Sequence, residues 1–195
     1  YPSGDNISCN GLADGSVDIT VENGSPGYTY TWSTLDGSGL FTTQQDQMAL
    51  SAGTYSVIAT DTNGCTITTS ITLVEPPILS VGINILSDYF GMSVSCSGNS
   101  DGEIEAVVLG GSPDYVYSWN TVPVQTSPLL SGLSEGLYIV TITDINGCAA
   151  IDTTVLIANP RPILIPDPAV EVCEGEMVTF SSNSNPLEMC SWTLS

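Results

Sequence analysis

The chain has 195 residues, of which 42% are hydrophobic, and it carries a single basic residue, Arg161, against 21 acidic ones. The apolar content is sufficient for real cores, but a formal net charge of −20 without lysine or histidine excludes binding to nucleic acid and to anionic lipid surfaces. No apolar run is long enough for membrane insertion. The usual catalytic bases, histidine and lysine, are also missing, so we expect no enzymatic activity.

The segments that follow the first cysteine alternate apolar and polar residues in short stretches. Residues 17–21 place Val, Ile and Val on one face, residues 28–32 place Tyr, Tyr and Trp, and residues 55–59 place Tyr, Val and Ala. This period of two is typical of half-buried strands, which are separated here by turn sequences such as Gly24-Ser-Pro26 and Asp61-Thr-Asn-Gly64. No stretch of helical period is present, so the sequence predicts an all-β chain.

The same motifs occur twice, in the same order. Cys9-Asn-Gly-Leu-Ala-Asp-Gly15 matches Cys96-Ser-Gly-Asn-Ser-Asp-Gly102 at an offset of 87 residues. After a four-residue deletion, Asp61-Thr-Asn-Gly-Cys65 matches Asp144-Ile-Asn-Gly-Cys148. Self-similarity on this scale indicates repeated structural units.

The units are predicted to be tandem antiparallel β-sandwiches of immunoglobulin or fibronectin-III type with Greek-key connections, because short strands recur every 8 to 12 residues or so. We place the first at residues 1–76, the second at 77–160 and the opening of a third module at 161–195. The first unit has only eight residues before its first cysteine, so we expect it to lack its N-terminal strand and the chain to be an excerpt of a longer polypeptide. Proline-rich connectors at 74–77 and 158–162 favour stiff links, so the modules should form a rod.

Cysteines mark both ends of each repeat, since one opens the unit and one follows its Asp-x-Asn-Gly turn. No Cys-x-x-Cys pair is present to nucleate a zinc site, so disulfides in an oxidising compartment are the better interpretation. The repeat positions predict bridges from Cys9 to Cys65 and from Cys96 to Cys148, each near one end of its sandwich. Each would close a loop of more than about 50 residues and contribute about 4 kcal/mol in the chain-entropy model.

Two cysteines near the C-terminal end leave their pairing open. Cys173 opens the third unit and by analogy would pair with a cysteine beyond residue 195, which leaves Cys190 without a partner. A local bridge from Cys173 to Cys190 is the alternative, and the sequence does not decide between the two.

Four aspartates occupy the paired turns, Asp14 and Asp61 in the first repeat and Asp101 and Asp144 in the second. Calcium prefers several oxygen ligands from acidic turns, and a disulfide within each repeat would bring both of its aspartates to the same end. However, Asp-Gly and Asp-x-Asn-Gly are also ordinary turn sequences whose side chains cap their own backbone, and neither has the full calcium-loop spacing. Calcium at these residues is therefore a hypothesis, and no other cofactor is expected.

Two further patterns have both a functional and a structural interpretation. Glu103 and Glu105 share a strand face, as a glycosidase pair would, but that face aligns with the outward-facing Ser16 and Asp18, which indicates solvated surface. The Tyr-x-Tyr-x-Trp strand could form a platform for sugar rings. Its alternation beside a Gly-Ser-Pro turn favours core packing instead, with the tyrosine hydroxyls at the rim.

The first repeat carries four motifs in order, Ile7-Ser-Cys-Asn-Gly11, Gly24-Ser-Pro-Gly-Tyr-Thr-Tyr-Thr-Trp32, Leu50-Ser-Ala-Gly-Thr-Tyr55 and Asp61-Thr-Asn-Gly-Cys65. Together with their second copies they resemble the SprB-type repeat of very large cell-surface proteins of Bacteroidota, including gliding-motility adhesins. The resemblance extends over residues 7–76 and 94–160, and the third opening resembles an immunoglobulin-like or PKD-like module. It implies export across the outer membrane by the type IX system, roles in adhesion and gliding, and no catalytic residues.

The leading hypothesis is a non-catalytic structural and adhesive repeat of a large secreted adhesin or filament at the bacterial cell surface. Its expected partners are neighbouring modules of the same chain, surface polysaccharide and other adhesin chains. A carbohydrate-binding module and an accessory module of a secreted hydrolase are the alternatives. Asp152-Thr-Thr154 also resembles the O-glycan acceptor pattern of Bacteroidota, which makes Thr153 a candidate glycosylation site.

Overall fold

The structure is a computed structural model that describes residues 1–163. This part of the chain folds into strands joined by turns and loops and contains no α-helix, so it also has no helix able to cross a membrane. Residues 164–195, which hold most of the expected third module with Cys173 and Cys190, lie outside the described part. The expected all-β class is confirmed.

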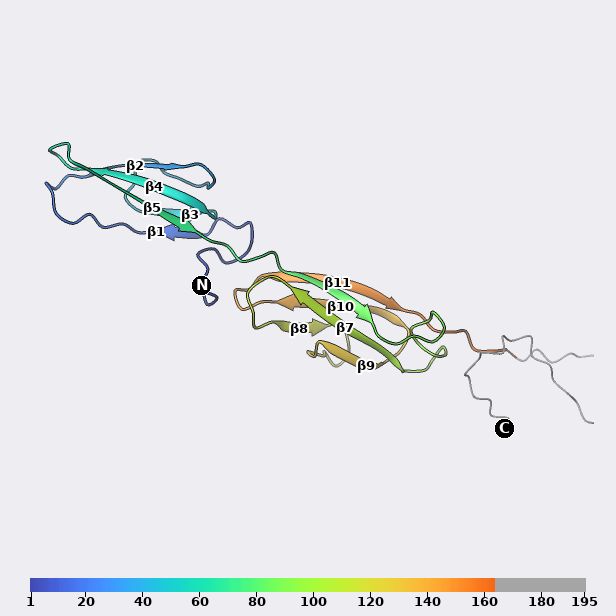
Figure 1. The fold of residues 1–195 in the computed structure, drawn as a ribbon. Coiled ribbons are helices and arrows are strands. Elements are labelled where there is room, and N and C mark those ends of the chain that lie inside the picture. The colour runs from blue at the N-terminus through green and yellow to red at the C-terminus, as the bar shows by residue number, and fades with distance from the viewer. Residues whose placement is uncertain (164–195) are drawn as a thin grey trace, which may run out of the picture. The chain divides into compact units, whose positions relative to one another are not determined.

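Residues 15–73 form two antiparallel sheets that lie in two layers (Figure 1). In one sheet, β1 (Gly15–Val17) pairs with β3 (Gln47–Leu50). The other sheet has the order β2 (Thr29–Thr34), β4 (Gly53–Thr60), β5 (Thr66–Leu73). Alternation of apolar residues along β4 gives the sheet one buried and one exposed face.

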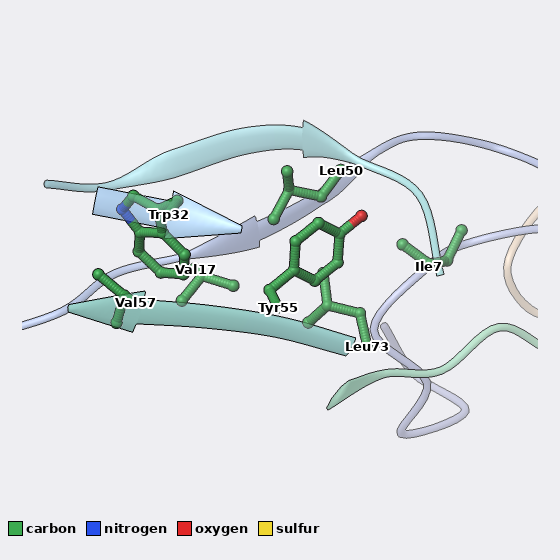
Figure 2. Close-up of a cluster of buried hydrophobic side chains, with 7 residues drawn as sticks. All are labelled: Ile7, Val17, Trp32, Leu50, Tyr55, Val57 and Leu73. Carbon is green, nitrogen blue, oxygen red and sulfur yellow. The ribbon is translucent and has the colours of Figure 1, made fainter. Parts of the chain in front are cut away.

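The core of this sandwich lies between the two sheets (Figure 2) and consists of seven buried side chains, Ile7, Val17, Trp32, Leu50, Tyr55, Val57 and Leu73. Trp32 lies opposite Val57 in the β2–β4 register, and its Nε1 donates to the Gln44 carbonyl at 2.8 Å. The Tyr55 hydroxyl lies among backbone groups and accepts from the Ser38 N–H at 3.0 Å. Burial of each large apolar side chain stabilises the fold by about 1.5–3 kcal/mol.

Residues 80–156 build two three-stranded antiparallel sheets from the second copies of the motifs (Figure 1). One has the order β6 (Ser80–Ile85), β7 (Gly102–Leu109), β9 (Leu129–Leu133), and the other the order β11 (Ala149–Leu156), β10 (Gly136–Thr143), β8 (Val116–Trp119). Both sheets contribute buried side chains, among them Ile104, Ala106, Leu130, Leu133, Trp119, Val140, Ile142 and Leu156. The Trp119 Nε1 donates to the Ser127 carbonyl at 2.9 Å, as its counterpart does to a loop carbonyl in the first repeat.

The glycine of each Asp-Gly motif is required by close packing. A Cβ atom on Gly15 would lie 2.7 Å from Ile7 Cδ1, and one on Gly102 would lie 2.8 Å from Leu156 Cδ1. The two repeats therefore use this glycine to bring the start of a strand against core side chains.

The contacts of the chain divide it into two compact units. The first comprises Tyr1–Gly82, Ala106–Pro128 and Ile139–Asp152, and the second comprises Ile83–Glu105, Leu129–Tyr138 and, within the described residues, 153–163. The sheets of the described residues instead follow the sequence repeats, because each sheet lies wholly within 15–73 or within 80–156. The module boundaries at 76/77 and 160/161 stay predictions.

Candidate functional site

The opening cysteine of each repeat lies in a loop that is held by one aspartate. The Asp14 carboxylate accepts hydrogen bonds from the Ser8 hydroxyl, the Ser8 N–H at 3.1 Å and the Tyr1 hydroxyl at 2.8 Å. Asp101 accepts from the Ser95 hydroxyl and from the Ser95 N–H at 3.0 Å. We did not predict these serines, although the signal was present, since a Ser-Cys pair opens both repeats.

The closing cysteine of the first repeat follows a turn built around Asp61. Its carboxylate accepts from the backbone N–H groups of Ser25, Asn63 and Cys65 at 3.1, 2.9 and 2.8 Å. One side chain thus ties the Gly-Ser-Pro loop to the closing turn and caps the turn itself.

The closing turn of the second repeat has the same construction around Asp144. This carboxylate accepts from the N–H groups of Ser112, Asn146 and Cys148 at 2.9, 3.0 and 2.9 Å. Asp144 is buried, and its N–H partners satisfy it there.

Hydrogen bonds hold the carboxyl groups of three of these aspartates below their ordinary pKa. The lowered pKa of Asp61 comes first from the backbone N–H of Ser25, and that of Asp101 from the hydroxyl of the serine before the opening cysteine. Desolvation raises the pKa of Asp14, but the hydrogen bonds from the serine and tyrosine donors outweigh it and the net shift is downward. The turns are therefore built to accept ionised aspartate.

The aspartates serve these turns as caps and do not converge on one point. Among residues 1–163, no group of three or more Asp, Glu, Cys or His side chains is arranged to hold a metal ion. The geometry favours the turn-capping interpretation, and calcium at Asp14, Asp61, Asp101 and Asp144 stays a prediction without a gathered ligand set.

A disulfide joins Cys9 to Cys148, with Cα atoms 5.7 Å apart and a sequence separation of 139. Both cysteines belong to the first compact unit. The bridge connects the opening loop of the first repeat to the closing turn of the second. A loop of this length contributes about 5 kcal/mol in the chain-entropy model.

The predicted pairing within each repeat is wrong for this structure. Cys65 is a free, exposed thiol, and Cys96 is disulfide-bonded but not to Cys148. Repeat position shows correctly that these cysteines lie beside turns. A bridge, however, needs Cα atoms within about 7 Å of each other, and the closing turn of the second repeat meets this condition with the opening loop of the first.

The segment around Cys9 is also held by hydrogen bonds to the closing turn of the second repeat. The Asn146 side-chain amide donates to the Ser8 carbonyl at 3.0 Å and to the Ser3 hydroxyl at 2.9 Å. It also donates to the Ser112 hydroxyl of its own repeat at 3.0 Å. The Asp-x-Asn-Gly motif predicts a turn role for Asn146 but gives no sign of this contact.

The connector that follows the first repeat is fixed to the same opening loop. The Asn10 amide donates to the Glu75 carboxylate and to the Pro76 carbonyl, both at 3.0 Å. The Pro77 carbonyl in turn accepts from the Gly111 N–H at 2.9 Å. The opening loop, the connector and the closing turn of the second repeat thus form one bonded junction inside the first compact unit.

The paired glutamates and the candidate glycosylation threonine lie on strands of the second repeat. Glu103 and Glu105 flank the buried Ile104 on β7, so their side chains lie on the face opposite the core. Thr153, the candidate glycosylation site, lies on β11 with its side chain exposed.

The aromatic strands serve the core. Trp32 is 3% exposed and Trp119 is 1% exposed, which leaves neither indole face open to a sugar ring. The hydroxyls of Tyr28 and Tyr115 reach the rim and donate to loop carbonyls at 2.8 and 2.7 Å. This arrangement follows the core-packing interpretation.

Comparison with known families gives one match, which occurs twice. The model of the SprB repeat matches residues 4–37 and 92–124. Each matched segment contains an opening cysteine, its aspartate-held loop and the strand that carries the buried tryptophan. No curated protein matches the chain.

Several solved structures are similar over part of the chain. A C-terminal 282-residue fragment of intimin, in complex with the intimin-binding domain of the translocated intimin receptor, has 13% identity and a TM-score of 0.42, and 73% of this chain and 56% of that chain are covered. The amphioxus IgVJ-C2 molecule has 10% identity and a TM-score of 0.36, with 75% and 97% covered. The N-terminal eight Ig domains of Down Syndrome Cell Adhesion Molecule have 14% identity and a TM-score of 0.35, with 75% and 24% covered.

Proposed function

Because the chain carries SprB repeats at residues 4–37 and 92–124, we propose that it is a load-bearing and adhesive segment of a large secreted cell-surface adhesin or filament. The observation that carries the proposal is the disulfide that joins one repeat to the next. A role in surface attachment or gliding motility, and export by the type IX system, belong to the same proposal and are supported by the family match.

The bridge changes how a pulled chain would respond to force. Residues 9 and 148 are covalently joined, so a load applied to the two ends of the chain bypasses the residues between them. Their separation of 139 residues corresponds to about 470 Å of extended chain, at about 3.4 Å per residue, that cannot be released while the bridge is intact. This protection suits a segment that transmits tension from a surface to a cell.

The composition supports a location outside the cell. Disulfides persist in oxidising, extracellular environments, and the described residues contain at least one that closes a long loop. The formal net charge of −20 keeps such chains soluble and separate from anionic surfaces.

An uncharged strand offers the adhesive surface. β5 has the sequence Thr-Ile-Thr-Thr-Ser-Ile-Thr-Leu, and all of its residues except Leu73 are exposed. It is an edge strand of its sheet, with unpaired backbone groups on one side. A neutral, threonine-rich edge on a strongly acidic protein fits neutral polysaccharide or the edge of another adhesin chain as its partner.

Force spectroscopy on the full chain, held by its two ends, tests the load-bearing part of the proposal. Under oxidising conditions we expect unfolding to release none of the length between residues 9 and 148, and reduction should add about 470 Å. Cys65→Ser is the matched control and should leave both traces unchanged. Release of the full length before reduction would overturn the proposal.

A flow assay tests the adhesive part. Beads coated with the chain should be retained on an agarose surface or on a surface coated with a second copy, and Ile67→Asp on β5 should lower retention several-fold. Leu35→Asp, at an exposed apolar residue outside the strands, is the control and should retain beads as the unchanged chain does. Equal losses in both variants, or no retention at all, would contradict an adhesive β5 edge.

A further inference from the structure

The two closing turns are built by the same hydrogen bonds, although only one of them holds a partner. In both turns the aspartate caps three N–H groups, and its own N–H donates to the cysteine carbonyl at 2.9 Å in the first repeat and 3.0 Å in the second. The turn asparagine also donates to a serine hydroxyl in each case, from Asn63 to Ser25 at 2.7 Å and from Asn146 to Ser112 at 3.0 Å. The turn of the first repeat is therefore formed without a bonded cysteine.

The turn of the second repeat shows what this construction binds. Cys148 is bonded to Cys9, and the Asn146 amide donates to the carbonyl of Ser8, the residue before that cysteine, at 3.0 Å. The occupied turn thus recognises a Ser-Cys opening segment through one covalent bond and at least one backbone hydrogen bond.

The first repeat presents the counterparts of both groups to solvent. Cys65 is exposed and carries a free thiol, and Asn63 has the sequence position of Asn146. Both groups are accessible, and none of the described residues is covalently bonded to the Cys65 sulfur.

A hollow lies beside Cys65 in the first repeat. It has a volume of about 150 Å³, and Gly24, Tyr28 and Cys65 are among the residues that line it. At the counterpart of Gly24 in the second repeat, Gly111, the N–H donates to the Pro77 carbonyl at 2.9 Å and a Cβ atom would lie 2.8 Å from Leu79 Cδ1. In the second repeat this place is covered by residues 77–79 of the same repeat, so the hollow shows that the first turn is open to solvent, and the occupant is indicated by the bonded Cys148 turn alone.

From these observations we propose that the closing turn at residues 61–65 is a receptor for the Ser-Cys opening segment of another SprB-type repeat, to which Cys65 bonds as Cys148 bonds to Cys9. The partner is recognised by its serine carbonyl and its cysteine sulfur. The proposal deepens the function proposed above and rests on it in one respect, because it requires another repeat as partner. Successive repeats would then be joined by staggered bridges, each from an opening loop to the closing turn of the next repeat.

The covalent step is thiol–disulfide exchange and needs a partner cysteine that is already oxidised. The Cys65 thiolate attacks the partner sulfur of a mixed disulfide with glutathione, forms the new S–S bond and releases glutathione as a thiolate, which takes up a proton. The oxidising equivalent is thus supplied by glutathione disulfide, and one disulfide is exchanged for another.

Exchange with a peptide probe tests the proposal on the full 195-residue chain. The probe is a synthetic peptide of residues 1–12 whose cysteine carries glutathione, and the comparison peptide has the same composition in scrambled order with the same modification. Adducts are located by mass spectrometry of fragments. We expect the adduct at Cys65 to form about tenfold faster with the native-order peptide, because only this peptide has a serine hydroxyl six residues before its cysteine, where the Ser3 hydroxyl accepts from the Asn146 amide in the occupied turn.

Two variants separate recognition from plain thiol reactivity. Cys65→Ser should form no adduct at this turn. Asn63→Ala should abolish the preference for the native-order peptide but react with oxidised glutathione alone at the unchanged rate, since Asp61 caps the backbone N–H of residue 63 and not its side chain.

Equal rates with the two peptides, or a preference that survives Asn63→Ala, would overturn the proposal and leave Cys65 as an unspecific exposed thiol. This readout is independent of force and of retention under flow. A chain that bears no load and retains no beads but selects the native-order peptide would refute the proposed function and leave the receptor standing.

Discussion

In the first repeat the closing cysteine is exposed and free, whereas in the second it is bonded to Cys9. Both cysteines nevertheless follow turns in which an aspartate caps three backbone N–H groups. The comparison shows that the turn is specified by its own sequence and forms with or without a disulfide. What the cysteine binds is decided by the segment that lies beside the turn.

The largest expected difference between the repeats concerns their closing cysteines. Cys148→Ser removes the bridge to Cys9 and should lower the free energy of unfolding by about 4–5 kcal/mol, because the unfolded chain regains the freedom of a long loop. Cys65→Ser breaks no bridge and should change the free energy of unfolding by less than about 0.5 kcal/mol. Denaturant titration under oxidising conditions measures both, and equal effects would contradict the assigned pairing.

The second-largest losses of stability are expected when the capping aspartates are replaced. Asp144→Ala leaves three N–H groups around a buried position without their charged acceptor and should cost about 3 kcal/mol. Asp61→Ala removes the same three bonds at an exposed turn where water can replace the carboxylate, so its cost should be clearly smaller. Thermal unfolding of the two variants makes the comparison. A larger loss for Asp61→Ala would refute the role assigned to burial.

A smaller difference is expected between the tyrosines that end the Leu-Ser-x-Gly-x-Tyr motifs. The Tyr55 hydroxyl is fully buried and lies 2.8 Å from the Ser51 carbonyl and 2.9 Å from the Ser38 carbonyl, so Tyr55→Phe should cost about 1–2 kcal/mol. Tyr138 is partly exposed and donates to the Ser134 carbonyl at 2.9 Å. Tyr138→Phe should therefore cost about 0.5 kcal/mol or less, as measured by denaturant titration.

The smallest expected effect is a dependence of stability on pH that both repeats share. The lowered pKa values of Asp14, Asp61 and Asp101 mean that the folded state favours the ionised carboxylates. Their contribution to stability is complete above the ordinary value of 3.8 and is lost as the pH falls below it through the folded pKa.

The free energy of unfolding, measured between pH 7 and pH 2, should therefore fall only at the acid end of this range. Asp101→Asn should make this fall less steep. Exposure and solvent screening keep each contribution small. A loss that begins near neutral pH, or an unchanged slope in Asp101→Asn, would contradict this assignment.

Much of this architecture is predictable from local sequence. Alternation placed Tyr55, Val57 and Ala59 on the buried face of β4, and the Asp-x-Asn-Gly motif placed a capping aspartate in each closing turn. These features depend on residues close in sequence, whose periodicity and turn chemistry are direct signals.

Features that depend on a partner segment were harder to predict. The alternation of residues 17–21 predicted a strand, but β1 ends at Val17, whereas β7 continues to Leu109 between β6 and β9. A strand needs a hydrogen-bonded neighbour, and alternation does not show whether one is present.

The disulfide escaped prediction for the same reason. Pairing within a repeat and pairing between repeats are equally compatible with the spacing of the cysteines, because both join an opening loop to a closing turn. The buried Gln47, whose amide donates to the Phe41 carbonyl at 2.9 Å, also gave no signal, since its counterpart in the second repeat is the apolar Leu130, which pairs with Ile104 as Gln47 pairs with Val17.

Direct mapping of the disulfides tests the bridge from one repeat to the next. Free thiols are blocked first, and the unreduced chain is then cleaved at its acidic residues, which separate Cys9, Cys65 and Cys148 into different fragments. We expect a linked pair of fragments that contains Cys9 and Cys148, together with a blocked Cys65. Fragments that link Cys9 to Cys65, or Cys96 to Cys148, would contradict this expectation.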